Sequence, residues 1–411
     1  MKHAPRAVSL AIVLTCVTGT FAAGVIAKAG CASGNWADGR QYTYLCYSDI
    51  VPLLGTEQLS GGRLPFLQAC ADVADQNCDE YPVLTMYFMR AAAWISGTTG
   101  YAPFYFVNAL LLLACAAAIA VCLWMLAGSR ALWFALAPTL LVYGTINWDL
   151  FAVALATGAL VAFADRRDAL AGVLLGLGVA AKFYPALLIL PLFFQRLQDR
   201  EPDRAIRVVW SAAATWGIVN VPFAIAAPGQ WWEFFRFNAA RPQDFDSLWY
   251  IACRHVDRAC FETGTVNLAS LALFVASFGG LWWWKARRSP TFPRWTLGFP
   301  LLVCFLLTNK VYSPQYGLWL LPWFVLALPG LKRFIVFQLA DVAVFVTRFW
   351  FFGELGGRFG VSQGVFELAV LARAFVLVWC LIGWVRTDAE PLALGTRGWR
   401  GALRQPEGVL A

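Results

Sequence analysis

The stretch LLGLGVAAKFYPALLILPLFF, residues 174–194, decides the fold, and Lys182 is its only charged residue. An α-helix needs roughly 20 apolar residues to cross the hydrocarbon core of a bilayer, and this stretch is that long. Lys182 and Pro185 interrupt it near the middle, whereas Gly176 and Gly178 permit close packing of helices. We therefore predict a hairpin of two helices with Lys182 at its tip, in preference to one continuous span with a snorkelling lysine.

The whole chain has the composition of a polytopic membrane protein. Of its 411 residues 60% are hydrophobic and only 14% are charged, and the mean hydropathy is +0.62. A soluble globule of this size would need far more charged surface. Similar apolar runs recur between residues 7 and 384, and strands of alternating polarity are absent. A chain that spans a membrane forms either helices or a closed barrel of alternating strands. Because such strands are absent, we predict an all-α bundle.

The first apolar run, 7–27, follows MKHAPR and is followed by Lys28 and Ala29, so it also has features of a cleaved secretory signal. Its 21 residues exceed the apolar part of an ordinary signal, which favours a retained crossing.

About twelve crossings agree with the charge pattern when the N-terminus is cytoplasmic. This arrangement leaves 19 of the 32 Lys and Arg residues in inner segments, as the positive-inside rule requires. The net charge of +8 then reflects membrane orientation, and no nucleic-acid partner is predicted. The expected spans are 7–29, 102–127, 131–146, 149–164, 168–182, 183–195, 206–226, 264–284, 295–309, 315–329, 333–351 and 364–385.

Residues 1–385 form a single membrane domain in this interpretation, and 386–411 form a cytoplasmic tail. Two long segments, 30–101 and 227–263, lie on the outer face, and the first carries a helix over 82–96 that lies at the membrane surface. Close spacing favours the disulfides Cys70–Cys78 and Cys253–Cys260, which leaves Cys31 with Cys46; the alternative is free thiols. No spacing of His and Cys residues indicates a metal site.

Polar residues on the outer side of apolar runs are the candidate site. They are Asp49 in CYSDIVPL, Glu80 and Tyr81 in CDEYPVL, Asp149 in INWDLF, Lys182, Arg241 in RPQDFDSLWY, and Lys310, Tyr312 and Gln315 in NKVYSPQYG. An ionisable group at membrane depth is costly and is by default functional. The alternative is that Asp49, Glu80 and Asp149 only cap helices or form turns. Arg373 is expected to pair with Asp341 or another buried acceptor as a structural element.

Lysines and a carboxylate on one face are typical of an anionic head group bound beside a general base. A sugar carried on a polyprenyl phosphate needs no nucleotide, which agrees with the absence of nucleotide-binding motifs. An aspartate is ordinarily ionised at neutral pH, so Asp49 can accept a proton as an acceptor hydroxyl attacks. Direct displacement would invert the anomeric centre.

Six phrases, in this order, carry a family resemblance. The chain resembles the GT-C superfamily, and within it glycosyltransferase family 87, the polyprenyl-phosphate-mannose-dependent mannosyltransferases, from about residue 42 to 322. The phrases are CYSDIVPL, EYPVLTMYFM, NWDLFAVALA, GVLLGLGVAAKFYPALLILPL, FN with RPQDFDSLWY, and NKVYSPQYGLWLLP.

The resemblance implies transfer of mannose from polyprenyl phosphomannose to a glycolipid or lipoglycan, with Asp49 as the base. Lys182 and Lys310 match basic positions of the family's phrases, and their contact with phosphate is inferred from their charge. The enzyme would lie in the plasma membrane with its site on the extracytoplasmic face. No cofactor is expected, and assistance from a divalent cation is left open.

The competing interpretation is a transporter or lipid flippase in which Lys182, Arg373 and Asp341 line a path. The sequence has no internal repeat, and its polar groups gather at one leaflet, which disfavours a path through the membrane. Nothing in the sequence favours a third class, a non-catalytic scaffold.

Overall fold

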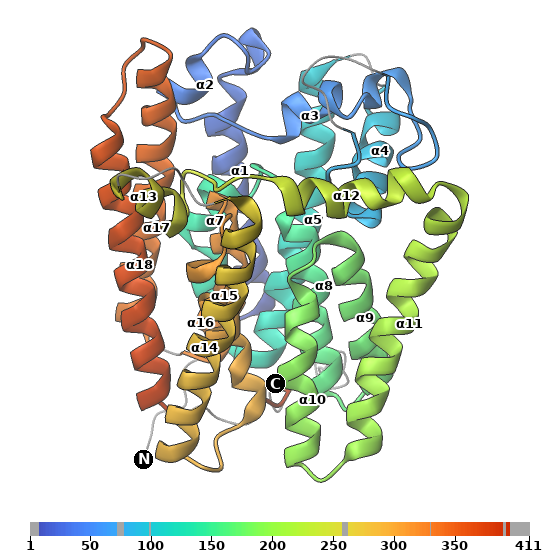
Figure 1. Ribbon diagram of the computed structural model, residues 1–411, viewed down its shortest axis with the longest axis vertical. Helices are drawn as coiled ribbons and strands as arrows, with labels where there is room; N and C mark the ends of the chain where they lie inside the picture. The colour runs from blue at the N-terminus through green and yellow to red at the C-terminus, as the bar shows by residue number, and fades with distance from the viewer. Residues whose placement is uncertain are drawn as a thin grey trace, which may run out of the picture.

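The computed structural model describes residues 8–71, 78–97, 100–256, 262–328, 330–388 and 392–394. Within these residues the chain is helical and contains no β-strand, as Figure 1 shows. The predicted all-helical class is therefore confirmed.

Six long helices are apolar enough to cross a membrane, counted over the described residues. They are α1 (Leu10–Ala29), α5 (Tyr101–Ala127), α11 (Pro202–Ala226), α14 (Thr263–Arg288), α17 (Leu331–Leu355) and α18 (Gln363–Arg386). In α1, the residues Val13, Val17 and Phe21 are buried, and the helix packs against α5, α6 and α7.

The other six expected spans coincide with shorter helices. These are α6 (Ala131–Ala135) with α7 (Pro138–Tyr143), α8 (Asp149–Ala164), α9 (Asp168–Ala181), α10 (Pro185–Gln198), α15 (Gly298–Thr308) and α16 (Gly317–Leu326). The longest, α8, has 16 residues and rises only about 24 Å at 1.5 Å per residue. It is shorter than the roughly 30 Å hydrocarbon core, so the number of twelve crossings stays a prediction.

The predicted hairpin at Lys182 is present. Helix α9 ends at Ala181, Lys182 follows in an extended conformation with φ −154° and ψ 140°, and Pro185 opens α10. Proline suits the first turn of a helix because the N–H that it lacks would have no partner there. The hairpin packs on α11 through two glycines: a Cβ on Gly172 would lie 2.4 Å from the Val208 carbonyl oxygen, and one on Gly176 would lie 2.5 Å from that of Ala212.

Short helices gather at one end of the bundle. Figure 1 shows α2 (Arg40–Thr43), α3 (Ile50–Thr56) and α4 (Val83–Ile95) at the upper end, with α12 (Pro228–Ala240) running across the long helices and α13 (Leu248–His255) beside α17. Helix α4 corresponds to the helix predicted over 82–96. Five 3-10 turns complete the described elements: Ala32–Gly34, Leu59–Gly61, Gly128–Arg130, Arg294–Leu297 and Pro314–Tyr316.

Helix α16 lies in the core, and all ten of its residues are buried. A helix that is apolar on every side is stable only when other helices surround it, as they do here. Beside it, Arg373 of α18 forms the expected ion pair with Asp341 of α17, Nη1 to Oδ1 at 3.4 Å, with both side chains buried. The buried position of α16 fixes the preceding turn, and the candidate site is built on that turn.

Candidate active site

A cavity of about 620 Å³ opens among the short helices at this end of the bundle. Its walls come from five parts of the chain: residues 47–56 with 80–82, the turn at 147, the hairpin tip at 182–184, residues 234–241 of α12 and beyond, and residues 305–319. Cavities of several hundred cubic ångströms lined by aromatic groups with a few convergent polar groups are typical ligand sites.

Asp49 lies in the wall of this cavity and is held there by two hydrogen bonds. Its Oδ1 accepts from the Tyr47 hydroxyl at 2.8 Å, and its Oδ2 accepts from Asn147 Nδ2 at 3.1 Å. Asp49 occupies the N-cap position of α3, yet its side chain makes no capping hydrogen bond. The capping alternative therefore does not explain the carboxylate.

The backbone around Asp49 is attached to the 145–147 turn. The Asp49 N–H donates to the Ile146 carbonyl at 2.9 Å, and the Ser48 hydroxyl donates to the Thr145 carbonyl at 2.6 Å. Asn147 also donates to the Tyr81 hydroxyl at 2.7 Å, and both residues line the cavity. Burial, followed by the charge of Asp49, raises the pKa of both tyrosines, Tyr47 and Tyr81, well above the ordinary value, so their hydroxyls stay protonated.

Lys182 lines the cavity at the hairpin tip and forms an ion pair with Asp149. Its Nζ lies 3.3 Å from Oδ2 of Asp149, which is fully buried, and the lysine side chain is only 14% exposed. Asp149 also accepts from the Trp319 indole N–H at 2.6 Å. The lysine is thus held inside the protein by an ion pair, which differs from the snorkelling alternative, in which its ammonium would reach water.

Three stacked rings form the wall beside Lys182. Tyr184 stacks on Trp319 with ring centroids 4.2 Å apart, and Trp319 stacks on Tyr316 at 3.9 Å. The Lys182 ammonium lies 5.4 Å from the ring centroid of Tyr81 and 5.3 Å from that of Tyr316, within range of cation–π attraction. The Lys182 ammonium is therefore held by the rings of Tyr81 and Tyr316 and by the Asp149 carboxylate.

Lys310 and Arg241 also line the cavity. Lys310 Nζ donates to the Ala239 carbonyl at 2.9 Å, and burial followed by the nearby charge of Arg241 lowers the pKa of Lys310 to about 8. Arg241 Nη2 lies 3.3 Å from Asp244 Oδ2 and keeps 35% of its side chain exposed. Gln315, which is buried, lines the cavity on the same turn as Lys310.

Glu80 brings a second carboxylate to the cavity wall. Burial raises the pKa of Glu80 to about 7; the charge of Arg241 opposes this, and those of Glu233 and Asp49 add to it. Its backbone N–H donates to Glu57 Oε1 at 3.3 Å, and the Asp79 N–H donates to Glu57 Oε2 at 2.7 Å. The buried Glu57 thus holds the two residues that precede Tyr81.

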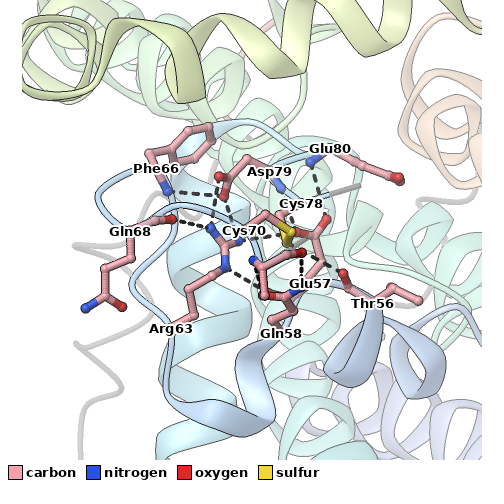
Figure 2. Close-up of a disulfide and its surroundings, with 11 residues drawn as sticks. Thr56, Glu57, Gln58, Arg63, Phe66, Gln68, Cys70, Cys78, Asp79 and Glu80 are labelled. Atoms are coloured by element: carbon pink, nitrogen blue, oxygen red, sulfur yellow. Dashed lines mark hydrogen bonds and ion pairs between the residues drawn. A yellow bond between two sulfur atoms is a disulfide. The ribbon is translucent and has the colours of Figure 1, made fainter. Parts of the chain in front are cut away.

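A disulfide and an ion pair hold the same loop from the other side. Cys70 is bonded to Cys78, and Arg63 binds Asp79 through two hydrogen bonds of 3.0 and 2.9 Å. Figure 2 shows these groups packed together, with the Glu80 side chain turned away from them. Burial raises the pKa of Glu57 to about 8, although it accepts two backbone N–H groups. A second disulfide, Cys31–Cys46, holds the loop that leads to Asp49, and the expected Cys253–Cys260 pair involves residue 260, outside the described residues.

Seven of the nine predicted site residues line this cavity: Asp49, Glu80, Tyr81, Lys182, Arg241, Lys310 and Gln315. Asp149 lies beneath the wall as the partner of Lys182. Tyr312 is buried away from the cavity, with its ring 3.6 Å from the guanidinium carbon of Arg373.

Two groups of residues at the site are not among the nine predicted site residues, although Asn147 and Asp244 lie in the sequence phrases INWDLF and RPQDFDSLWY that pointed to the site. Tyr47 and Asn147 hold Asp49, and Asp244 binds Arg241 together with Arg348 of α17. Arg348 had a usable signal, because it is a charge within an apolar run. Across the described ranges, no group of three or more His, Cys, Asp or Glu side chains is arranged to hold a metal ion.

Comparison with known families now identifies the chain. The model of glycosyltransferase family 87 matches residues 80–314, which is more than half of the sequence. The protein belongs to glycosyltransferase family 87. The resemblance noted from the sequence phrases is thereby confirmed, and the chain is a membrane glycosyltransferase consistent with the GT-C superfamily. A search of curated proteins found no match. Asp49 lies well before the matched residues 80–314 and Gln315 directly after them, so their place at the site rests on the structure.

Proposed function

We propose that this family 87 enzyme transfers a hexose, by resemblance mannose, from a polyprenyl-phosphate donor to an envelope glycolipid or lipoglycan with inversion. We further propose that it works in the plasma membrane with the cavity on the extracytoplasmic side. The observation that carries the proposal is the arrangement of one cavity, in which a firmly held carboxylate, Asp49, shares the walls with Lys182, Lys310 and Arg241.

In the proposed reaction Asp49 removes the proton from the acceptor hydroxyl as the hydroxyl oxygen bonds to the anomeric carbon. The bond between that carbon and the phosphate oxygen breaks at the same time, and the phosphate departs with the electron pair. Tyr47 and Asn147 orient the carboxylate, which is the role of residues that fix a base within reach of its proton.

The cations stabilise the charge that gathers on the leaving phosphate. Lys182, Arg241 and Lys310 line the cavity from three different parts of the chain, so a bound phosphate could meet more than one of these cations. Glu80 and Tyr81 border the space near Asp49, where hydrogen bonds to sugar hydroxyls of the acceptor would be made. Direct displacement with a single base gives the inverted anomer.

A flippase has less support. Of the three buried groups that raised this alternative, Lys182 lines the cavity, whereas Arg373 and Asp341 pair with each other and do not line it.

The test uses purified, reconstituted protein and radiolabelled polyprenyl phosphomannose with an envelope lipid extract as the source of acceptors. Asp49→Asn should lower transfer by roughly 10²- to 10⁴-fold, the range for loss of a general base. The matched control is Asp38→Asn, which removes an exposed carboxylate of the same segment that is paired with Arg40 and does not line the cavity. Wild-type transfer by Asp49→Asn would contradict the assignment of the base, and label that remains on the donor lipid with every extract would contradict the function.

A further inference from the structure

A buried ionic group lies behind the wall that carries Arg241 and Lys310. It consists of Asp244 and Asp246, which are 7% and 1% exposed, and of Arg348 from α17, whose side chain is 13% exposed. Arg348 forms ion pairs with both carboxylates. Because Arg348 belongs to the long helix α17, these ion pairs attach the segment that carries Asp244 and Asp246 to the helical bundle.

Asp244 is shared between two arginines through its two oxygens. Its Oδ1 accepts from Arg348 Nη1 at 3.3 Å and from Nη2 at 3.2 Å, and its Oδ2 accepts from Arg241 Nη2 at 3.3 Å. Ser313, which lines the cavity, also donates to Oδ2 at 3.4 Å, and the Asp244 N–H donates to the Lys310 carbonyl at 2.9 Å. Asp244 therefore contacts three residues that line the cavity: Arg241, Ser313 and the backbone of Lys310.

The two arginines differ in freedom. Arg241 keeps 35% of its side chain exposed to the cavity, whereas Arg348 is enclosed by Phe352 and Phe245, with ring centroids 5.0 and 6.0 Å from its guanidinium carbon. Arg241 can thus turn toward a bound anion, while Arg348 stays with Asp244. Burial acts to raise the pKa of Asp244, but Arg348 and Arg241 outweigh it and hold that pKa below its usual range.

The charge balance decides what Arg348 does. A buried carboxylate without a cation is costly, and breaking a buried pair is strongly unfavourable. With Arg348 in place, Arg241 can turn away from Asp244 while Asp244 keeps two hydrogen bonds from Arg348, which also pairs with Asp246. Without Arg348, Arg241 would be the remaining arginine on Asp244 and would be held there.

We propose that Arg348 is a positioning residue for the donor: it compensates the charge of Asp244 and so frees Arg241 to bind the donor phosphate. The inference rests on the proposed function, since it assumes a lipid phosphate in the cavity. It assigns Arg348 no contact with the reacting atoms.

The same turn of α17 also contacts Tyr47, which holds Asp49. An effect of Arg348 on the donor can therefore be distinguished from an effect on the base. Phe349 stacks on Tyr47 with centroids 4.7 Å apart, and Tyr47 donates to Asp49. A variant that keeps Phe349 should keep Tyr47 in position and with it the orientation of the Asp49 carboxylate. Loss of Arg348 should therefore raise KM for the donor and leave KM for the acceptor near its wild-type value.

The experiment compares Arg348→Ala, Arg348→Lys and the triple variant Arg348→Ala with Asp244→Asn and Asp246→Asn in reconstituted enzyme, because Arg348 pairs with both carboxylates. We expect KM for the donor to rise roughly 10- to 100-fold in Arg348→Ala, the factor for a lost hydrogen bond to a charged group. Arg348→Lys should recover part of this, and the triple variant should recover most of it, because both carboxylates that Arg348 pairs with are gone. Lack of recovery in the triple variant would overturn the proposal.

The matched control is Arg254→Ala. Arg254 also ties the second outer segment to the bundle, through Glu367 at 2.6 Å, but it does not line the cavity. Equal kinetic effects in Arg254→Ala and Arg348→Ala would show that Arg348 only attaches its segment to the bundle and has no specific effect on donor binding. If Arg348→Ala fails to fold, Asp244→Asn alone decides: a donor KM no higher than wild type supports the proposal, and a tenfold rise overturns it.

Binding of farnesyl phosphate, measured by calorimetry, separates this inference from the proposed function. If the wild-type enzyme neither binds farnesyl phosphate nor transfers sugar, the proposed function fails and the inference falls with it. If the wild type does both and Arg348→Ala binds farnesyl phosphate as tightly as Arg254→Ala, only the inference fails.

Discussion

Lys310 and Lys182 are both cations of the cavity, but their surroundings give them different properties. Lys182 is paired with the buried carboxylate of Asp149, whereas the described partner of the Lys310 ammonium is the Ala239 carbonyl. Burial and the charge of Arg241 lower the pKa of Lys310 to about 8. The charge of Lys310 therefore changes within the pH range of ordinary assays.

We predict that kcat/KM for the donor falls as the pH rises above about 8. Lys310 is charged below its pKa of about 8 and neutral above it, so binding of an anionic donor weakens on the alkaline side. Lys310→Arg should remove this decline, because arginine stays protonated beyond about pH 12. Glu57, whose pKa burial raises to about 8, titrates in the same range, so a decline that persists in Lys310→Arg would reject Lys310 as its origin.

At the residue scale, sequence reasoning located charges in apolar surroundings because their cost can be read from the chain itself. It could not show that Asn147 donates to Asp49, since the two are 98 positions apart. It also placed Tyr312 in the site. Residues 311–313 have no helical hydrogen bonds, Val311 and Ser313 face the cavity, and in an extended chain the side chain between them points the other way.

The element that best shows how the bundle positions the site is the pair α9 and α11. The carbonyl oxygens of Val208 and Ala212 occupy the space that side chains on Gly172 and Gly176 would need. Lys182 lies one residue past the end of α9, so the close approach of these helices sets the depth of the lysine in the cavity. The hairpin was predictable from its apolar run and its proline, but its depth depends on contacts with a helix outside that run.

Replacing Gly176 by Ala should destabilise the protein by about 1 kcal/mol or more, the usual cost of overpacking. The new Cβ would lie 2.5 Å from the Ala212 carbonyl oxygen and 2.8 Å from Thr215 Cβ, so α9 and α11 must separate. Gly158→Ala on α8 is the control, because its Cβ would meet Leu174 Cδ1 at an ordinary 3.5 Å. Thermal unfolding in detergent measures both: we expect a lower Tm for Gly176→Ala only, and equal shifts would contradict the packing argument.

Element lengths were the weakest part of the sequence-based prediction. The apolar run 131–146 is divided into α6 and α7 by Pro138, which opens a new helix because it cannot continue the previous one. Average apolarity does not register such a break. The run therefore indicates burial among the helices of the bundle correctly while overstating the length of the continuous helix.

For the whole molecule, the decisive property is that the cavity lies at one end of the bundle. Helix α14 is a long helix with Glu262 at its N-cap and Arg288 in its last turn, so its two ends can be used to orient the bundle in the membrane. Its last turn carries Lys285, Arg287 and Arg288, and basic residues favour the cytoplasmic side. The N-cap end of α14 lies near α12, which lines the cavity, because Asn267 donates to the Ala239 carbonyl at 3.0 Å.

We therefore predict opposite accessibility for cysteines placed at the two ends of α14. Glu262→Cys and Arg288→Cys are matched exposed positions on one helix. In intact cells a membrane-impermeant maleimide should label Glu262→Cys and should label Arg288→Cys only after permeabilisation, with the unmodified protein as the background control. The reverse pattern would place the cavity on the cytoplasmic side. A donor presented in the outer leaflet could not then reach Lys310 and Arg241, so this result would refute the proposed location of the reaction while leaving membership of family 87 intact.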